Sequence, residues 1–325
     1  MEHSPIEHLN VTQAGPSLLD KLHIDPARVE SATLRRYDKR ADRGMVQGGD
    51  WDLHTKAIEE ADFHQDELQD RRETHYALLD EVSVCIDRHG HFILEAGGHR
   101  FCSARLLDIN SIPVQVSVRH REWMNFRDEV VAYAARHNGK VYAPLCHPDL
   151  AAIPSAHGHK RFETLLAGLS ARDGRLLDIG AHWGYFCHRF EDAGFDCTAV
   201  EADAAYLHFL NKLRVAERKR FEVFSGSIFD YQPTERFALV LALNIFHHFL
   251  KTEEAFAQLK ALLPRLDTDA IAFEPHIPTE PQMEGAYRNF SPSEFVAFVL
   301  EHSDLTQATQ LDDAEDGRPV YLLTR

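Results

Sequence analysis

The sequence predicts an α/β protein, with a doubly wound, mostly parallel sheet in the C-terminal half and a smaller α+β unit before it. The chain has 325 residues, and a single hydrophobic core is rarely enough for a chain of that length. The length therefore favours two domains. From about residue 161, short apolar runs alternate with helical stretches, the pattern of parallel strands covered on both faces. The first of these runs ends in a glycine-containing turn that opens a helix.

The elements of the C-terminal half follow from these runs. The predicted buried strands are Arg175–Ile179, Cys197–Val200, Phe221–Phe224, Phe237–Leu243 and Ala270–Phe273. The predicted helices between them are Tyr185–Ala193, Ala204–Arg218 and Glu253–Leu266. Strands that alternate with helices form βαβ units, so the result is a doubly wound sheet.

The N-terminal half is divided into three parts. Residues 1–75 are rich in charge and poor in apolar periodicity, which predicts an extension with short helices. Residues 76–128 form the α+β unit, with predicted strands Val82–Ile86, His91–Glu95 and Ile112–Val118 and a predicted helix His99–Asp108. Residues 129–160 are a linker and connecting helix, predicted from Asp128 to Asn138 and followed by Pro144, Pro148, Pro154 and Gly158.

Composition restricts the partners and the compartment. The formal net charge of −16 disfavours nucleic acid and anionic membranes, which bind clustered basic residues. No apolar run approaches the roughly 18 residues that span a bilayer, and the polar N-terminus predicts a cytoplasmic protein. Five scattered cysteines fit reduced thiols. The 21 histidines lack the spacing of a metal site, so we expect no metal. The oligomeric state is left open.

The turn after the first predicted strand is the main functional candidate. It reads Leu177-Asp-Ile-Gly-Ala-His-Trp-Gly184, and glycines there let the backbone pass close to a ligand. A dinucleotide needs a second glycine near the pyrophosphate, and His182 stands at that position. Glu201 ends the next strand, where an acidic side chain can accept hydrogen bonds from ribose hydroxyls. A nucleoside ligand without a closely bound pyrophosphate is therefore favoured.

Asp178 to Gly184 resembles the signature of class I S-adenosylmethionine-dependent methyltransferases, which have a Rossmann-like fold. The resemblance covers the domain at residues 161–325, including Asp304–Leu311 and Val320–Leu323, which resemble the family's terminal β-hairpin. It implies S-adenosyl-L-methionine as cofactor. The residues that it places around the cofactor are Asp178, Gly180, Ala181, His182 and Gly184 in the turn, Glu201 at the ribose, Ser227, Ile228 and Phe229 near the adenine, and Asn244 near the methionine.

Candidate catalytic residues follow the fourth and fifth strands, whose carboxyl ends open on the ligand-binding face. His247 and His248 are one pair, because an imidazole exchanges protons near neutral pH. Glu274 and His276, around Pro275, are the second pair. A helix cap and core packing are the alternative roles.

Residues 87–116 resemble the ParB-like, sulfiredoxin-like domain. The resemblance implies phosphate binding by Gly97, Gly98, His99 and Arg100, and backbone N–H groups beside an arginine suit an anion. A structural turn with Arg100 in an ion pair is the alternative.

The sequence thus predicts a methyltransferase that acts on a phosphorylated or nucleotide-like small molecule. One alternative is a non-catalytic regulator that binds the cofactor and acts through the ParB-like unit. The other is a nucleotide-dependent phosphotransferase activity in that unit.

Overall fold

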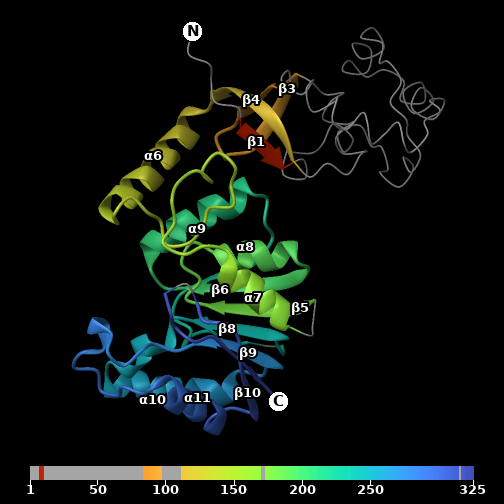
Figure 1. Ribbon diagram of the computed structural model, residues 1–325. Coiled ribbons are helices and arrows are strands. Elements are labelled where there is room, and N and C mark those ends of the chain that lie inside the picture. Colours follow the sequence, from red (N-terminus) through yellow and green to blue (C-terminus); the bar gives the residue numbers. More distant parts are fainter. Residues whose placement is uncertain (1–6, 11–82, 97–110, 170–172, 234, 315) are drawn as a thin grey trace, which may run out of the picture. The chain divides into compact units, whose positions relative to one another are not determined.

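The computed structural model describes residues 7–10, 83–96, 111–169, 173–233, 235–314 and 316–325 (Figure 1). The chain divides into two compact units, residues 1–130 with 148–152 and residues 131–147 with 153–325. Some predictions lie outside the described residues: the phosphate-binding turn at Gly97, Gly98, His99 and Arg100, the helix after it, and the short helices before residue 76.

The first unit contains a four-stranded sheet in the order β1-β4-β2-β3. Its strands are β1 (Glu7–Asn10), β2 (Ser83–Ile86), β3 (Phe92–Ala96) and β4 (Ser111–Arg119). The last three lie where the sequence predicts strands. β1 was not predicted, and it pairs antiparallel with β4. Strand β2 pairs antiparallel with β3 and parallel with β4, so the sheet is mixed.

Helix α6 (Arg121–Arg136) begins before the predicted start at Asp128. Trp123, Phe126 and Val130 are buried, and their spacing of three and then four residues marks one helix face. The predicted helix left out Trp123 and Phe126, which stand among polar residues and already belong to α6. The Trp123 indole also donates to Asp149 over 2.8 Å, within the same unit.

The second unit contains a seven-stranded sheet in the order β10-β11-β9-β8-β5-β6-β7. The strands are β5 (Gly174–Ile179), β6 (Phe195–Glu201), β7 (Glu222–Ser225), β8 (Leu239–Leu243), β9 (Ala270–Glu274), β10 (Gln307–Gln310) and β11 (Tyr321–Thr324). Strands β5 to β9 are parallel, whereas β11 pairs antiparallel with β9 and β10. The predicted parallel sheet and terminal hairpin are confirmed.

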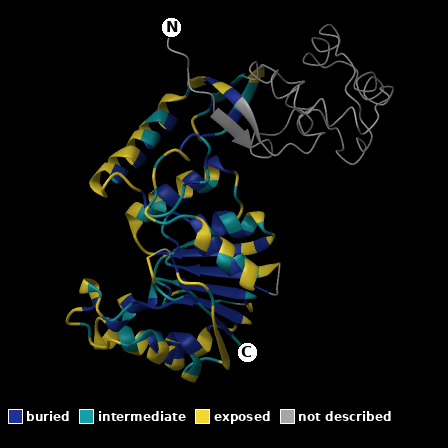
Figure 2. Cartoon of the chain, viewed as in Figure 1, coloured by how far each residue is buried: buried dark blue, intermediate teal, exposed yellow. Residues whose placement is uncertain are grey.

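Helices cover both faces of this sheet (Figure 1). They are α7 (Lys160–Gly168), α8 (Tyr185–Asp192) and α9 (Ala204–Ala216) on one face, and α10 (Glu253–Leu262) and α11 (Pro292–Glu301) on the other. Successive strand residues alternate between two cores, with Leu176 in one and Leu177 in the other. The central strands β6, β8 and β9 and the second half of β5 are therefore largely buried, whereas the edge strand β10 is exposed (Figure 2).

Short 3-10 helices follow several strands and helices. They are η3 (Phe246–Leu250), η4 (Leu263–Arg265) and η5 (Pro281–Met283). The predicted helix Glu253–Leu266 is thus α10 followed by η4, because Pro264 has no N–H group to continue the α-helical pattern. Among the described helices, none combines the length and apolarity needed to cross a bilayer.

Candidate functional site

The turn between β5 and α8 lies at the carboxyl edge of the parallel sheet. The backbone N–H groups of Gly180 and Ala181 both donate to the Val200 carbonyl, over 2.9 and 3.0 Å. Gly180 has a φ of +73°, and an added Cβ would lie 2.7 Å from Ile245 Cδ1. His182 also has positive φ, at 53°. The turn therefore needs glycine at position 180 and leaves its neighbours close to the ends of β6 and β8.

The Glu201 carboxylate at the end of β6 holds this turn in place. Oε2 accepts from the His182 N–H over 2.7 Å, and Oε1 accepts from the N–H groups of Ala202 and Asp203, each over 2.8 Å. The Asp203 side chain in turn caps α9, accepting from the Ala205 N–H over 2.7 Å. A carboxylate has about four acceptor positions, so these three bonds leave one on Oε2.

Asp178, at the end of β5, is a buried carboxyl, and among the described residues no cation pairs with it. Its Oδ2 lies 3.7 Å from the Cys187 thiol, and the Glu201 carboxylate is near enough for its charge to act on Asp178. Burial raises the pKa of Asp178 to about 7, and the negative charge of Glu201 acts in the same direction. Asp178 is therefore poised to ionise if a positively charged ligand group approaches.

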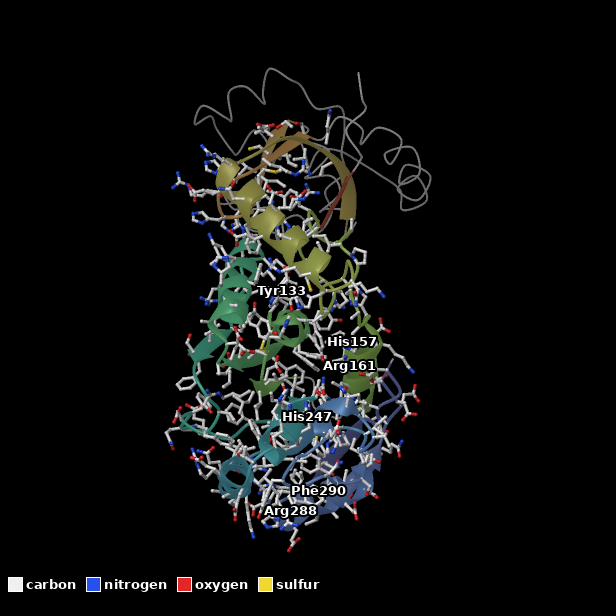
Figure 3. All side chains as sticks on the ribbon, turned by 90° about the vertical axis from the view of Figure 1, so that its left-hand side faces the viewer. Tyr133, His157, Arg161, His247, Arg288 and Phe290 are labelled. Atoms are coloured by element: carbon white, nitrogen blue, oxygen red, sulfur yellow. The ribbon has the colours of Figure 1, made fainter. Side chains whose placement is uncertain are left out.

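These residues line a cavity of about 430 Å³ that lies wholly within the second unit. Of the predicted cofactor residues, Asp178, Gly180, Ala181, His182, Glu201 and Asn244 are in its wall. Other lining residues were not singled out from the sequence: Tyr133, His137, Tyr142, Arg161, Trp183 and Tyr206. Figure 3 labels two of these, Tyr133 from α6 and Arg161 from α7. The volume is within the usual range of small-molecule sites.

An aromatic cluster surrounds the His182 ring in the cavity wall. Its ring centroid lies 4.2 Å from that of Tyr206 and 5.2 Å from that of Tyr142, and it stacks on Trp183. Burial lowers the pKa of His182 to about 4, so the imidazole is neutral at physiological pH. The wall here is flat, uncharged and suited to a planar or apolar ligand group.

The end of β8 contributes an unsatisfied amide to the same cavity. Asn244 has a φ of 54°, and its Nδ2 donates to the Tyr142 hydroxyl over 3.3 Å. Its Oδ1 is buried, and no described residue donates to it. Because a buried carbonyl oxygen normally has a donor, a ligand N–H or O–H group is the natural partner for Asn244 Oδ1.

The four predicted catalytic residues occupy different environments. His248 is exposed and lines the cavity, whereas His247 is 2% exposed and does not. Burial lowers the pKa of His247 to about 3, and neither ring nitrogen has a hydrogen-bond partner among the described residues. The His247 ring lies 4.0 Å from that of His248 and 6.2 Å from that of His276. The structure thus brings the three histidines together, with His248 facing the cavity.

Glu274 and His276 have partners inside the protein. Glu274 accepts from Arg161 over 3.0 Å and lies 3.6 Å from Arg318. Burial raises the pKa of Glu274. His276 Nε2 bonds to Asn289 Oδ1 over 2.9 Å. Neither Glu274 nor His276 is in the cavity wall.

The predicted adenine-side residues and Gly184 lie outside the cavity wall. Ile228 is buried in the core under α10 and α11, and Phe229 packs on Phe249 with ring centroids 4.7 Å apart. The Ser227 hydroxyl accepts from the Phe229 N–H. Gly184 precedes α8 with a φ of +83°, and a Cβ there would meet Phe221 at 3.3 Å.

Residues 156–279 match a family described as Methyltransferase domain. The C-terminal region of the chain is thus similar to a methyltransferase domain, and the matched residues include the glycine turn and the acidic strand ends.

Individual relatives match over part of their length. A tRNA U34 carboxymethyltransferase from Dichelobacter nodosus (strain VCS1703A) is 31% identical over 103 residues, which are 31% of this chain and 33% of the relative. The bifunctional kinase-methyltransferase WbdD is 19% identical, with a TM-score of 0.46 over 60% of this chain and 46% of WbdD. The methyltransferase domain of bacterial CtHen1 is 14% identical, with a TM-score of 0.40 over 51% of this chain and 98% of that domain.

Proposed function

We propose that the C-terminal domain binds S-adenosylmethionine and transfers its methyl group to a small molecule. The observation that carries the proposal is the Asp178 carboxyl, which is buried in the wall of a cavity at the carboxyl edge of the sheet and has no cationic partner in the part of the chain that the structure describes. Burying a carboxyl in this way costs folding free energy, which a cationic ligand group would offset. The methyltransferase domain match supplies the class of reaction.

The residues present fit this cofactor. Asp178 and the unsatisfied Asn244 Oδ1 would accept hydrogen bonds from the methionine ammonium group. The remaining acceptor position on Glu201 Oε2 would take a ribose hydroxyl. The uncharged aromatic cluster around His182 offers flat surfaces to the nucleoside. The glycine turn lets the backbone approach the ligand without side chains in between.

The cofactor would supply a methyl carbon bound to a positively charged sulfur, which an acceptor lone pair can displace. The chain must hold the acceptor in line with that carbon and accept its proton. His248 is the predicted catalytic residue that lines the cavity, and partial desolvation of its ring together with the positive charge of Lys251 lowers its pKa. A neutral His248 imidazole would therefore take the proton from a hydroxyl or amine acceptor.

Calorimetry with S-adenosylhomocysteine, followed by labelled methyl transfer into fractionated cell extract, tests the proposal. The whole chain should bind the ligand, and Asp178→Ala and Glu201→Ala should abolish both binding and transfer. Asp196→Ala is the matched control, because Asp196 is an exposed acid on β6. A wild-type chain that binds no S-adenosylhomocysteine would contradict the proposal. Binding without transfer into any fraction would instead favour a regulator.

We further propose that residues 76–128 form a ParB-like unit whose Gly97, Gly98, His99 and Arg100 help select a phosphorylated or nucleotide-like acceptor. The proposal rests on the sequence resemblance. Loss of acceptor labelling on Arg100→Ala, with S-adenosylhomocysteine binding retained, is the expected result. Turnover of ATP or CTP that depends on Arg100 would favour phosphotransferase chemistry instead.

A further inference from the structure

Part of the cavity wall is not used by the cofactor residues proposed above. Asp178 and Glu201 stand at the ends of β5 and β6, whereas Arg161 pairs with Glu274 at the end of β9. In the sheet, β9 is separated from β5 by β8, and neighbouring strands lie about 4.8 Å apart. Arg161 therefore borders a part of the cavity on the β9 side of β8, and His248 lines the same cavity.

Arg161 brings positive charge to this region. Of the described residues that line the cavity, it is the one with a permanent positive charge, and it is only 4% exposed. The chain as a whole carries a formal charge of −16, which repels anions. An acidic ligand entering this cavity would need a local cation, and Arg161 supplies it.

The guanidinium is held rigidly while keeping donors available. Its Nη1 donates to Glu274 Oε2 over 3.0 Å, and its centre lies 6.0 Å from the Tyr142 ring. The other oxygen of Glu274 lies 3.6 Å from Arg318 Nη1, and Arg318 is fixed by two 2.8 Å bonds to Glu280. A guanidinium has five N–H donors, more than Glu274 and Tyr142 use. The donors that these contacts leave over are of the kind that binds phosphate and carboxylate.

Fold stability gives little reason for an arginine at this position. Arg161 is in the first turn of α7, where the helix dipole disfavours positive charge. Replacing a buried ion pair by apolar residues is often neutral or stabilising. A buried arginine that lines a cavity is therefore better explained by a ligand than by folding.

We propose that the acceptor carries an acidic group, a phosphate monoester or a carboxylate, and that Arg161 binds this group inside the cavity. The inference rests on the proposed function and names the class of its acceptor. Methyl transfer would then occur at another atom of the acceptor, near His248.

Ligand-observed NMR on the whole chain, saturated with S-adenosylhomocysteine, tests the proposal at constant ionic strength. The probes are inorganic phosphate and acetate, with chloride as the anion control. We expect phosphate or acetate to bind more tightly than chloride, and Arg161→Gln to weaken that binding about tenfold or more. Arg175→Gln is the matched control, because Arg175 pairs with the exposed Glu235 at the opposite end of β5. Preference for phosphate indicates a phosphorylated acceptor, and preference for acetate indicates a carboxylic acid.

The double variant Arg161→Gln/Glu274→Gln separates ligand binding from ion pairing, because it removes both charges and leaves no unpaired buried ion. It should bind S-adenosylhomocysteine as the wild type does and still fail to bind the acid. Acid binding restored in the double variant would overturn the proposal, as would equal binding of acids and chloride by the wild type. If the proposed function itself is wrong, the result is different, because no sample, including the wild type, would bind S-adenosylhomocysteine.

Discussion

Among single residues, Asp178 shows most clearly that the site and the fold place opposing demands on the chain. Burial raises its pKa from 3.8 to about 7, so the folded protein holds the proton more tightly than the unfolded chain does. The contribution of Asp178 to the free energy of unfolding is therefore most favourable at low pH and is lost as the pH rises through about 7. At neutral pH and above, the ionised carboxyl destabilises the ligand-free fold.

Asp178→Asn should consequently stabilise the ligand-free protein at about pH 8, by on the order of a few kcal/mol. The gain should shrink as pH falls toward 3.8, where the carboxyl is protonated in both states. Urea unfolding at several pH values measures it, with Asp196→Asn as the exposed control. If Asp178→Asn instead lowers the free energy of unfolding at high pH, an interaction within the fold compensates the negative charge of Asp178, and the prediction is wrong.

The same group predicts the pH dependence of ligand binding. Because an ammonium group pairs with the ionised form, S-adenosylhomocysteine should bind more tightly as pH rises toward 7 and then reach a plateau. Asp178→Asn should flatten this profile and weaken binding by about tenfold to a hundredfold. Calorimetry across the range measures both effects. A wild-type profile without this rise would mean that Asp178 does not meet the ammonium group.

Glu201 shows the opposite balance, since the fold itself uses its carboxylate. Both carboxylate oxygens of Glu201 accept from backbone N–H groups. Glu201→Gln would replace one of these oxygens by an NH₂ group, which cannot accept a hydrogen bond. We expect a loss of about 1–3 kcal/mol in unfolding free energy, together with weaker ligand binding. Glu222→Gln, an exposed acid at the start of β7, should change neither. Unchanged stability in Glu201→Gln would contradict the threefold acceptor role.

Sequence alone could predict the residues whose roles depend on local chain geometry. Asp178, Gly180 and Glu201 are fixed by the ends of two strands and one turn, all visible in a short stretch of sequence. Arg161 and Tyr142 reach the cavity only because α7 and the segment before it fold over the sheet. An arginine in the buried face of α7, beside Phe162 and Leu165, was the one signal that could have revealed Arg161.

At the scale of elements, the strand-turn-helix at β5 and α8 depends on space as well as on backbone conformation. Gly180→Ala should combine the strain of positive φ with the contact to Ile245 at 2.7 Å. Gly317→Ala is the matched control, because its φ is +81° with nothing near its would-be Cβ. The strain of positive φ should lower the free energy of unfolding of both variants by about 1–2 kcal/mol. Gly180→Ala should have a further loss from its contact with Ile245.

Thermal unfolding of these two variants and of Gly180→Ala/Ile245→Ala measures the steric part. The smaller Ile245 side chain should recover part of the excess loss, although it also removes buried apolar surface. Equal losses at Gly180 and Gly317 would contradict the close approach of β5 to the end of β8.

Element boundaries followed from the sequence where the pattern was continuous. The apolar runs Leu239–Leu243 in β8 and Ala270–Phe273 in β9 are buried and were predicted as strands. The predicted start of α6 was wrong. Trp123 and Phe126 stand among charged residues in the sequence, and only the tertiary structure shows that these two side chains pack in a core. Strand β1 pairs with β4 across most of the first unit's sequence, so no local signal could identify it.

For the whole molecule, the domain start that we proposed at residue 161 leaves out part of the cavity wall. Tyr133, His137, Tyr142 and Cys146 line the cavity, and all precede residue 156, where the methyltransferase domain match begins. A fragment of residues 121–325 keeps α6 and every lining residue. Calorimetry should therefore give this fragment the same S-adenosylhomocysteine affinity as the whole chain.

A fragment of residues 156–325 should bind weakly or unfold, because the aromatic cluster around His182 loses Tyr142. Wild-type affinity in the shorter fragment would show that the upstream segment serves only the acceptor.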